Sequence, residues 1–388
     1  MNGRGDSLIY LDNAATTRMY PKAIQAATDV MTNYWANPSS NYSIADNPRI
    51  LIENVRQQFA DDLNCTPEEL IFTSSGCEAN NLAILGFLKN NAGYELYTSD
   101  MEHASISEFV ENRPATLGHA TIPVNEIGQI NPYELRNLFI ERQKFSNRKP
   151  FVSIQAANSE IGVKQDIKAL AEVVHQYNGI IHCDAVQLFP EQRINVDDWN
   201  VDMLSISAQK FHSGRGCGVL FVRDNIEISP TTYGSQENHR RGGSYNTSAI
   251  VAAGKALEIT RLHDSKSYVK SLRDKLLNKL LTIPDTRLNG PRNKDNRLVN
   301  NISLTIDGVS AERLVILCDL AGVMIAKGSA CQSHEPTPSK TLLTIGLTPE
   351  QALSTIRITL DEFNTEEEIE QAASIISKLV WRIRNNEA

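Results

Sequence analysis

Apolar and polar residues follow two different periods along the first two thirds of the chain. Apolar residues at helical spacing, with polar residues between them, predict helices over 47–63, 78–90 and 167–176. Short apolar runs between such segments predict strands, at 69–72, 151–155, 180–184, 203–206 and 218–222. Strands separated by helices need crossover connections, so this pattern predicts the α/β class, with a mostly parallel sheet covered by helices on both faces.

The last third follows a different pattern. A long helical stretch over about 248–282 precedes strands at 301–306 and 355–359, a helix at 311–321 and an end helix from Thr365. This order predicts a smaller α+β domain at the C-terminal end. We place the large domain at residues 16–258, and we assign residues 1–15 and 259–388 to the small domain. The polar stretch 289–297 is expected to be a surface loop.

Composition narrows the classes of function. The chain has 388 residues, 41% of them hydrophobic, which is enough for more than one core, and its formal net charge is −8. An acidic balance does not favour a nucleic acid as partner. No apolar run approaches the roughly 20 residues of a membrane span, and residues 1–7 lack the apolar core of a signal peptide. We therefore expect a cytoplasmic protein that does not bind a membrane.

The six cysteines are dispersed and form neither a CxxC pair nor a cluster with the spacing of a metal site, so no metal is expected. In a reducing cytosol they are expected to be free thiols. A free cysteine is usually a small buried apolar residue. Cys331 differs, because it follows Gly328-Ser329-Ala330 in a polar loop that contains Pro336 and Pro338. Such a position is typical of a nucleophile.

Two strand ends carry residues suited to an aldehyde cofactor. Lys210 follows the strand at 203–206 and precedes a glycine-containing loop, where its amine can form a Schiff base. Asp184 ends the strand at 180–184, where ligands of open parallel sheets bind, and its carboxylate can pair with a protonated pyridine nitrogen. Taken singly, each has an ordinary alternative: a solvated lysine, and an aspartate that caps the next helix.

Three further segments carry candidate chemistry. Residues 73–78 (TSSGCE) are expected to form a strand–turn–helix junction whose backbone N–H groups can bind an anion. The alternative is that they form an ordinary helix cap. His103 follows a strand-like segment and can stack on a ring or move protons, or have only a structural role. Arg357 lies within the strand at 355–359, and its guanidinium matches a carboxylate if it points inward. An outward-facing arginine is the alternative.

The order and spacing of these motifs resemble one family over nearly the whole chain. From Ile9 to Thr17 (IYLDNAATT) onward, the sequence resembles the cysteine desulfurases, which belong to the class V aminotransferase family of pyridoxal-phosphate enzymes. Further matching stretches are 37–40 (NPSS), 160–163 (EIGV), 241–244 (RGGS) and 365–369 (TEEEI). The resemblance implies an aspartate-aminotransferase-like fold with a seven-stranded sheet in the large domain.

The resemblance also assigns the cofactor, pyridoxal 5'-phosphate, to particular residues. Lys210 matches the Schiff-base lysine, Asp184 the partner of the pyridine nitrogen, Gln187 the contact of the phenolic oxygen and His103 the histidine that stacks on the ring. The remaining cofactor-binding positions are Gly76, Cys77, Ser159, Ser207, Gln209 and Ser244. Ser244 matches a threonine that the second subunit contributes to the phosphate, which implies a homodimer with shared active sites.

On the substrate side, the resemblance implies that Arg357 binds the carboxylate of L-cysteine, with Asn37 and Asn158 nearby. Lys210 leaves the aldehyde, takes the α-proton with the help of His103, and the Cys331 thiolate attacks the substrate sulfur. The products are a persulfide on Cys331 and L-alanine. A protein sulfur acceptor follows from this chemistry, and it stays unidentified: an iron–sulfur scaffold, a tRNA-thiolation protein or a DNA-modification protein. The long segment between Cys331 and 346–347 resembles members that deliver sulfur directly to scaffold proteins.

Three positions depart from the family pattern. Cys77 stands where a phosphate-binding threonine is usual, Gln209 replaces a histidine and Ser159 replaces an asparagine. All three can still donate hydrogen bonds, although a thiol donates more weakly than a hydroxyl. They put the substrate and the acceptor in doubt more than cofactor binding.

Other functions remain open at this point. Another reaction of the same family would use Lys210 and Arg357 without Cys331: selenocysteine cleavage, transamination or cysteine lyase chemistry. A catalytically idle sulfur-transfer scaffold is a further alternative.

Overall fold

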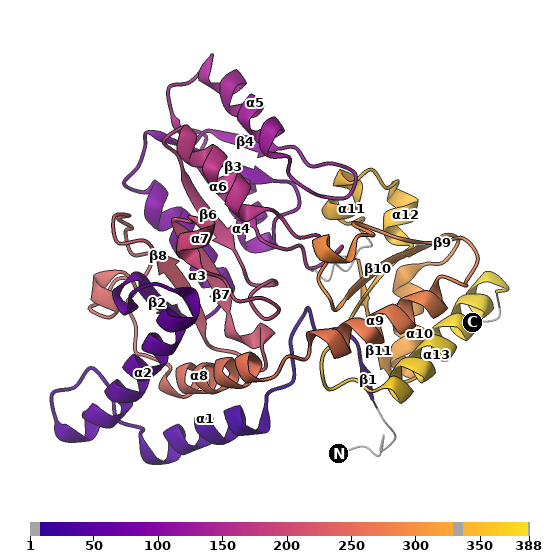
Figure 1. Cartoon of the computed structure of the whole chain (residues 1–388), viewed down its shortest axis with the longest axis horizontal. Helices are drawn as coiled ribbons and strands as arrows, with labels where there is room; N and C mark the ends of the chain where they lie inside the picture. The colour runs from indigo at the N-terminus through magenta and orange to yellow at the C-terminus, as the bar shows by residue number, and fades with distance from the viewer. Residues whose placement is uncertain (1–7, 329–336, 387–388) are drawn as a thin grey trace.

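The protein consists of two lobes (Figure 1). A computed structural model describes residues 8–328 and 337–386. The larger lobe contains a seven-stranded sheet, whose strands are β2 (Leu70–Thr73), β3 (Tyr94–Ser99), β4 (His119–Ile122), β5 (Lys149–Gln155), β6 (Ile180–Asp184), β7 (Met203–Ser207) and β8 (Gly218–Val222). Its helices are α1 (Pro21–Asn33), α2 (Asp46–Leu63), α3 (Gly76–Leu88), α4 (Ala104–Asn112), α5 (Pro132–Gln143), α6 (Ile167–Gln176), α7 (Val196–Trp199) and α8 (Thr247–Leu262).

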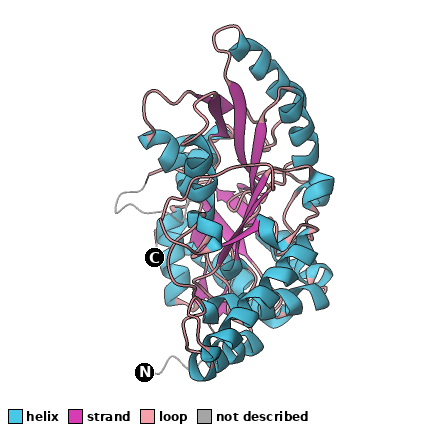
Figure 2. Cartoon of the chain, turned by 90° about the vertical axis from the view of Figure 1, so that its left-hand side faces the viewer, coloured by secondary structure: helices cyan, strands magenta, loops and turns pink. Residues whose placement is uncertain are grey.

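The strand order of the large sheet is β2-β8-β7-β6-β5-β3-β4. The neighbours from β7 through β6, β5 and β3 to β4 pair in parallel, and only β8 runs antiparallel to its neighbours β7 and β2. The predicted α/β class and the mostly parallel seven-stranded sheet are confirmed. The strands run through the interior with helices on either side (Figure 2).

Alternate residues of these strands enter two separate cores. Phe72, Leu204 and Ile206 belong to the larger hydrophobic cluster, whereas their neighbours Ile71 and Met203 belong to a second cluster that includes residues of α3. Side chains of a strand alternate between its two faces, so a strand covered on both sides must be apolar throughout. This requirement explains the uninterrupted apolar runs in the sequence.

All strands of the large sheet except β8 have their carboxyl ends at one edge, and five of these ends, those of β2, β3, β5, β6 and β7, border the same cavity. Because β8 is antiparallel to both β2 and β7, these two strands share the direction of β6, β5 and β3. The loops that follow β2, β3, β5, β6 and β7 therefore meet at this edge. Ligands of open α/β sheets bind at such edges.

The smaller lobe holds an antiparallel sheet with the order β12-β13-β10-β9 and a separate parallel pair, β1 with β11. Its strands are β1 (Ile9–Tyr10), β9 (Thr286–Leu288), β10 (Asn301–Ile306), β11 (Val323–Met324), β12 (Ala326–Lys327) and β13 (Thr355–Thr359). Its helices are α9 (Lys266–Leu280), α10 (Ala311–Leu320), α11 (Lys340–Thr344), α12 (Pro349–Leu353) and α13 (Glu366–Arg384).

The N-terminal strand packs with the C-terminal third of the chain. Ile9 and Leu11 are buried in the same hydrophobic cluster as residues of α9, β10, β13 and α13. This packing supports a small domain that contains both chain ends. The division that we place at 258/259 stays a prediction, and α8 continues through it to Leu262.

Two local expectations are wrong. The predicted helix over 248–282 is two helices, because α8 ends at Leu262 and α9 begins at Lys266. The Asp264 carboxylate accepts a hydrogen bond from the backbone N–H of Lys266, a contact typical of a helix start. The stretch 289–297 is not simply a surface loop, since Asn289 and Arg297 are buried and the Arg297 guanidinium bonds to Pro291 O and Asn301 Oδ1.

Short 3₁₀ helices complete the chain: η1 (Ser43–Ala45), η2 (Pro67–Glu69), η3 (Ala208–Lys210), η4 (Glu237–His239) and η5 (Lys294–Asn296). Within residues 8–328 and 337–386, no helix is both long and apolar enough to span a membrane.

Candidate active site

A cavity of about 120 Å³ lies where the five strand ends meet. Residues from the loops after β2, β3, β5, β6 and β7 line it. They are Ser75, Gly76, Cys77, Asn80, His103, Gln155, Ala157, Ser159, Asp184, Val186, Gln187, Ser207, Gln209 and Lys210. Nine of the residues that we predict to bind the cofactor are in this set. Residues far apart in the sequence therefore form one small polar chamber.

The first turn of α3 borders the cavity. Ser75 caps the helix, and its Oγ accepts a hydrogen bond from the Glu78 N–H at 3.2 Å. A Cβ atom on Gly76 would lie 2.8 Å from Cγ2 of Val186 and 3.0 Å from Cβ of Ser207, so only glycine lets this turn approach the neighbouring loops. The N–H groups of a first helical turn, together with the helix dipole, attract an anion. Partial burial raises the pKa of the Cys77 thiol, which favours a protonated sulfur that can donate a hydrogen bond.

Asp184 is buried and its carboxylate is held at both oxygens. Oδ1 accepts from the backbone N–H of Val186 at 3.0 Å, and Oδ2 accepts from Nδ2 of Asn80 at 2.7 Å. Two directed hydrogen bonds fix one side-chain conformation. This carboxylate can stabilise a protonated ring nitrogen in the cavity.

The Lys210 amine contacts the N-terminal segment of the chain. Its Nζ donates to the carbonyl oxygens of Ala14 at 2.6 Å and Ala15 at 2.7 Å, and Nε2 of Gln187 donates to Ala14 O at 3.2 Å. Residues 14–15 therefore cover one side of the chamber.

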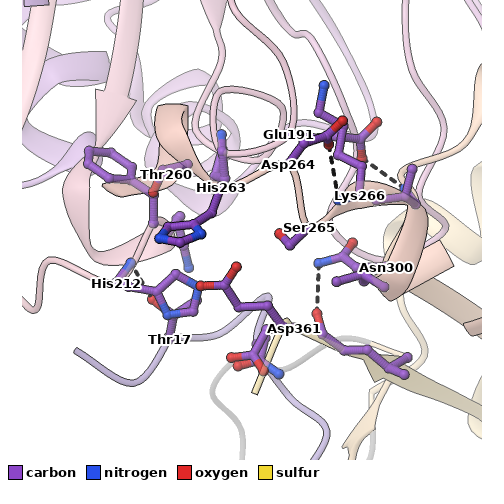
Figure 3. Close-up of a pocket in the computed structure, with 18 of the residues that line it drawn as sticks. Thr17, Glu191, His212, Thr260, His263, Asp264, Ser265, Lys266, Asn300 and Asp361 are labelled. Atoms are coloured by element: carbon purple, nitrogen blue, oxygen red, sulfur yellow. Dashed lines mark hydrogen bonds between the residues drawn. The ribbon is translucent and has the colours of Figure 1, made fainter. Parts of the chain in front are cut away.

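Gln187 and Lys210 also border a second cavity, of about 360 Å³, which is shown in Figure 3. Thr17, His212 and Asp361 point into it from different segments. Burial raises the pKa of Asp361, and the neighbouring His212 opposes this effect. Gln187 and Lys210 are the two of the fourteen residues lining the smaller chamber that also border this second cavity, so the two cavities adjoin there.

His103 caps α4 and is held by the residue two positions later. Its Nδ1 accepts from the Ser105 backbone N–H at 3.1 Å and lies 2.9 Å from Ser105 Oγ. The next residue back, Glu102, is buried, and burial raises the pKa of its carboxyl group to about 8.

Arg357 lies outside this cavity, in the small lobe. It is buried on β13, opposite Ser303 of β10 and Ala326 of β12, so the inward orientation is the correct one. Nη2 donates to Oδ1 of Asp12 at 2.6 Å, whereas Nε is buried and makes no hydrogen bond within the described residues. Burial raises the pKa of the nearby Glu160 to about 7, while the hydrogen bond from Ser339 Oγ and the charge of Arg357 lower it.

Besides Arg357, three predicted residues that the structure describes do not line the chamber: Asn158, Asn37 and Ser244. The Asn158 amide stabilises its own turn, since Oδ1 accepts from the N–H groups of Glu160 and Ile161. Asn37 and Ser244 are exposed on other loops. Cys331 lies outside the described residues.

Asn80 and Gln155 line the chamber and are absent from our predictions. Asn80 stands four residues after Gly76, a spacing that places both on one face of α3. This spacing is the signal that could have identified it. Gln155 ends the predicted strand at 151–155, and its position beside Asp184 follows only from the register of β5 and β6.

The chain matches a known protein family over nearly its whole length. The family described as "Aminotransferase class-V" matches residues 9–372. The chain is 34% identical over 385 residues to "Cysteine desulfurase IscS" of Methanosarcina thermophila, which covers 97% of this chain and 93% of that protein. It is also 34% identical over 387 residues to the protein of the same name from Dictyoglomus turgidum, covering 97% and 95%.

Solved structures agree with these matches. A NifS-like protein from Rickettsia africae superposes with a TM-score of 0.86 at 31% identity, covering 97% of this chain and 99% of that one. A structure described as "SspA in complex with cysteine" superposes with a TM-score of 0.79 at 28% identity, covering 92% and 100%.

Proposed function

The chain belongs to the class V aminotransferase family, and we propose that within it the chain is a cysteine desulfurase that converts L-cysteine to L-alanine. The observation that carries the proposal is the single chamber in which Lys210, Asp184, Gln187 and His103 converge. The names of its relatives support the same activity. The predicted enzyme class and the predicted cysteine desulfurase activity agree with these relatives.

The residues of the chamber fit pyridoxal 5'-phosphate. The glycine-lined first turn of α3 suits a phosphate, since a Cβ at Gly76 would fill the space beside Ser207. Asp184, fixed by two hydrogen bonds, suits a protonated pyridine nitrogen. Gln187 and His103 line the same chamber and suit the phenolic oxygen and the ring face, and Ser159 and Gln209 add polar contacts. Bound pyridoxal phosphate supplies an aldehyde that joins amines and a ring that accepts negative charge.

We assign proton movements to Lys210 and His103. The Lys210 amine would hold the cofactor through its aldehyde, and when not so attached its Nζ would accept the α-proton of the substrate and return a proton to carbon. The carbonyl groups of Ala14 and Ala15 give this amine a place to bind when it is not attached. His103, which lines the same chamber, would assist this proton transfer.

Arg357 binds the carboxylate of L-cysteine in this proposal. Its guanidinium is buried, anchored by Asp12 through Nη2, and keeps further N–H groups for a carboxylate. An anchored planar fork orients the substrate, because rotation of the guanidinium is restricted by β13 and by Asp12.

We propose that Cys331 receives the sulfur. Its thiolate attacks the substrate sulfur, so a new S–S bond forms while the C–S bond breaks. The electron pair of the broken bond stays on the substrate carbon, which gains a proton and becomes the methyl group of L-alanine. The persulfide on Cys331 then passes its outer sulfur to an acceptor protein.

We further propose a homodimer in which Ser244 completes the phosphate site of the other copy. Ser244 is exposed and does not line the chamber of its own chain. The loop that carries it begins beside α3, since Nε of Arg241 contacts Oε1 of Glu78 at 2.8 Å. Exposed apolar side chains on the nearby α1–η1 segment, at Met31, Trp35 and Ile44, would be covered by a second copy.

The test is turnover by the purified protein loaded with pyridoxal phosphate. With L-cysteine and a thiol reductant, we expect alanine and sulfide in equal amounts, and both should fall to background in Cys331→Ser. The variant should still show the change in visible absorbance that L-cysteine binding causes. Sulfide production at the wild-type rate by Cys331→Ser would contradict the assignment, and pyruvate in place of alanine would indicate another lyase reaction.

A further inference from the structure

Asn80 connects two residues of the chamber that lie on different strand ends. It is almost fully buried, with 1% of its surface exposed. Its Nδ2 donates to Oδ2 of Asp184 at 2.7 Å and to Oγ of Ser105 at 2.9 Å. The two hydrogens of one amide nitrogen are thus divided between Asp184 at the end of β6 and Ser105 in helix α4.

The orientation of this amide follows from its neighbour. An ionised carboxylate only accepts hydrogen bonds, so the NH₂ group of Asn80 must face Asp184. The opposite atom, Oδ1, is then buried and accepts no hydrogen bond within the described part of the chain. A buried acceptor without a partner is unfavourable, so the two donations must outweigh it for this conformation to persist.

The chain of hydrogen bonds continues to His103. Because Ser105 Oγ accepts from Asn80, its own hydrogen is available to His103 Nδ1 at 2.9 Å. The backbone N–H of Ser105 also points at Nδ1, at 3.1 Å. Both groups donate, so Nδ1 of the neutral ring is an acceptor and its proton resides on Nε2.

We propose that Asn80 is a positioning residue that ties Asp184 to His103, so that the neutral imidazole presents an N–H donor from Nε2 to the chamber. Asp184 directs the Asn80 amide, the amide directs the Ser105 hydroxyl, and the hydroxyl directs the ring. The Asn80 side chain thereby positions Asp184, assigned to the ring nitrogen of the cofactor, and His103, assigned to the face of the ring. The inference rests on the proposed function for the roles of Asp184 and His103, while the hydrogen bonds stand independently.

The test separates the two arms of this link. Asn80→Leu keeps the approximate volume and removes both donations, whereas Ser105→Ala removes only the arm to His103. Asn91→Leu, just beyond the end of the same helix, removes one hydrogen bond to Phe87 O and is the matched control. For each folded variant, the dissociation constant of pyridoxal phosphate is measured by titrating apoprotein, and kcat and KM for L-cysteine are measured on saturated protein.

We expect Asn80→Leu to bind the cofactor roughly tenfold or more weakly, because a hydrogen bond to a charged carboxylate is lost. Ser105→Ala and the control should bind it as wild type does. Both Asn80→Leu and Ser105→Ala should lower kcat with little change in KM. In the double variant kcat should fall no further than in Asn80→Leu, since that variant already loses the arm to His103 that Ser105→Ala removes.

Wild-type cofactor affinity in Asn80→Leu, or effects on kcat that multiply in the double variant, would overturn the inference. Failure of the wild-type protein to bind pyridoxal phosphate would instead overturn the proposed function. The two failures are therefore distinguishable.

Discussion

Replacing Arg357 by lysine tests how the substrate is held. Arg357 is fixed by its position on β13 and by the 2.6 Å contact of Nη2 with Asp12. Lysine keeps the positive charge beside Asp12 and Glu160, so the small lobe should still fold. It lacks the planar fork, and the substrate carboxylate loses one of its two charge-assisted hydrogen bonds.

One such hydrogen bond contributes about 1.5–3 kcal/mol. The kcat/KM for L-cysteine should therefore fall roughly 10- to 150-fold in Arg357→Lys, measured as the initial rate of alanine formation. The product offers a control, because L-alanine carries the carboxylate and L-alaninamide does not. The inhibition constant of L-alanine should rise by a similar factor, whereas that of L-alaninamide should change little. Equal changes for both compounds would refute the assignment of Arg357 to the carboxylate.

Three further predictions concern the frame of the site. Gly218→Ala would place a Cβ 2.4 Å from the Ser75 carbonyl group and should weaken pyridoxal-phosphate binding about tenfold or more. Gly93→Ala is the control, because no atom lies within 4 Å of its new Cβ, and it should bind the cofactor as wild type does. Equal affinities of the two variants in apoprotein titrations would count against the packing argument. Arg56→Met removes the bidentate contact, at 2.9 and 3.0 Å, that pairs the buried Glu237 carboxylate. The free energy of unfolding, measured in urea, should fall by about 3–5 kcal/mol, because a buried charge is left unpaired. A loss below about 1 kcal/mol would contradict this reasoning. Burial raises the pKa of the Glu102 carboxyl from 4.5 to about 8, so between these values the folded state retains a proton that the unfolded state releases. Stability should therefore fall as pH rises from about 4.5 through about 8. Glu102→Gln should remove that part of the pH dependence, as measured by urea midpoints at several pH values.

The sequence predicts five of the seven strands of the large sheet closely, because burial on both faces requires apolar runs with clear ends, whereas β4 is not among the predictions. The strands 180–184 and 218–222 have the observed bounds, and the strand at 203–206 extends by one residue to Ser207. The parallel sheet then requires that Asp184 and Lys210 lie at the same edge. The resemblance of the motifs supplied what periodicity alone could not, namely the cofactor and the division of roles.

Other features depend on contacts between distant segments. Asn80 is a polar residue that is buried on α3, and its burial is explained by the hydrogen bond to Asp184, a residue 104 positions later in the chain. The break between α8 and α9 contains neither glycine nor proline, so no strong local signal marks it. Arginine is usually found at the surface, but the guanidinium of Arg297 is buried and donates hydrogen bonds to a carbonyl oxygen and an amide oxygen of the folded chain. Polar groups that are satisfied by tertiary partners cannot be located from local pattern.

The central claim is the transfer of sulfur from L-cysteine to Cys331. The most direct measurement is peptide mass spectrometry after reaction of the cofactor-loaded protein with limiting L-cysteine, without reductant and with rapid alkylation. The account predicts one additional sulfur atom on the peptide that contains Cys331, in an amount equal to the alanine released. Alanine formation with an unmodified Cys331 peptide, or with the additional sulfur on another cysteine such as Cys77, would contradict it.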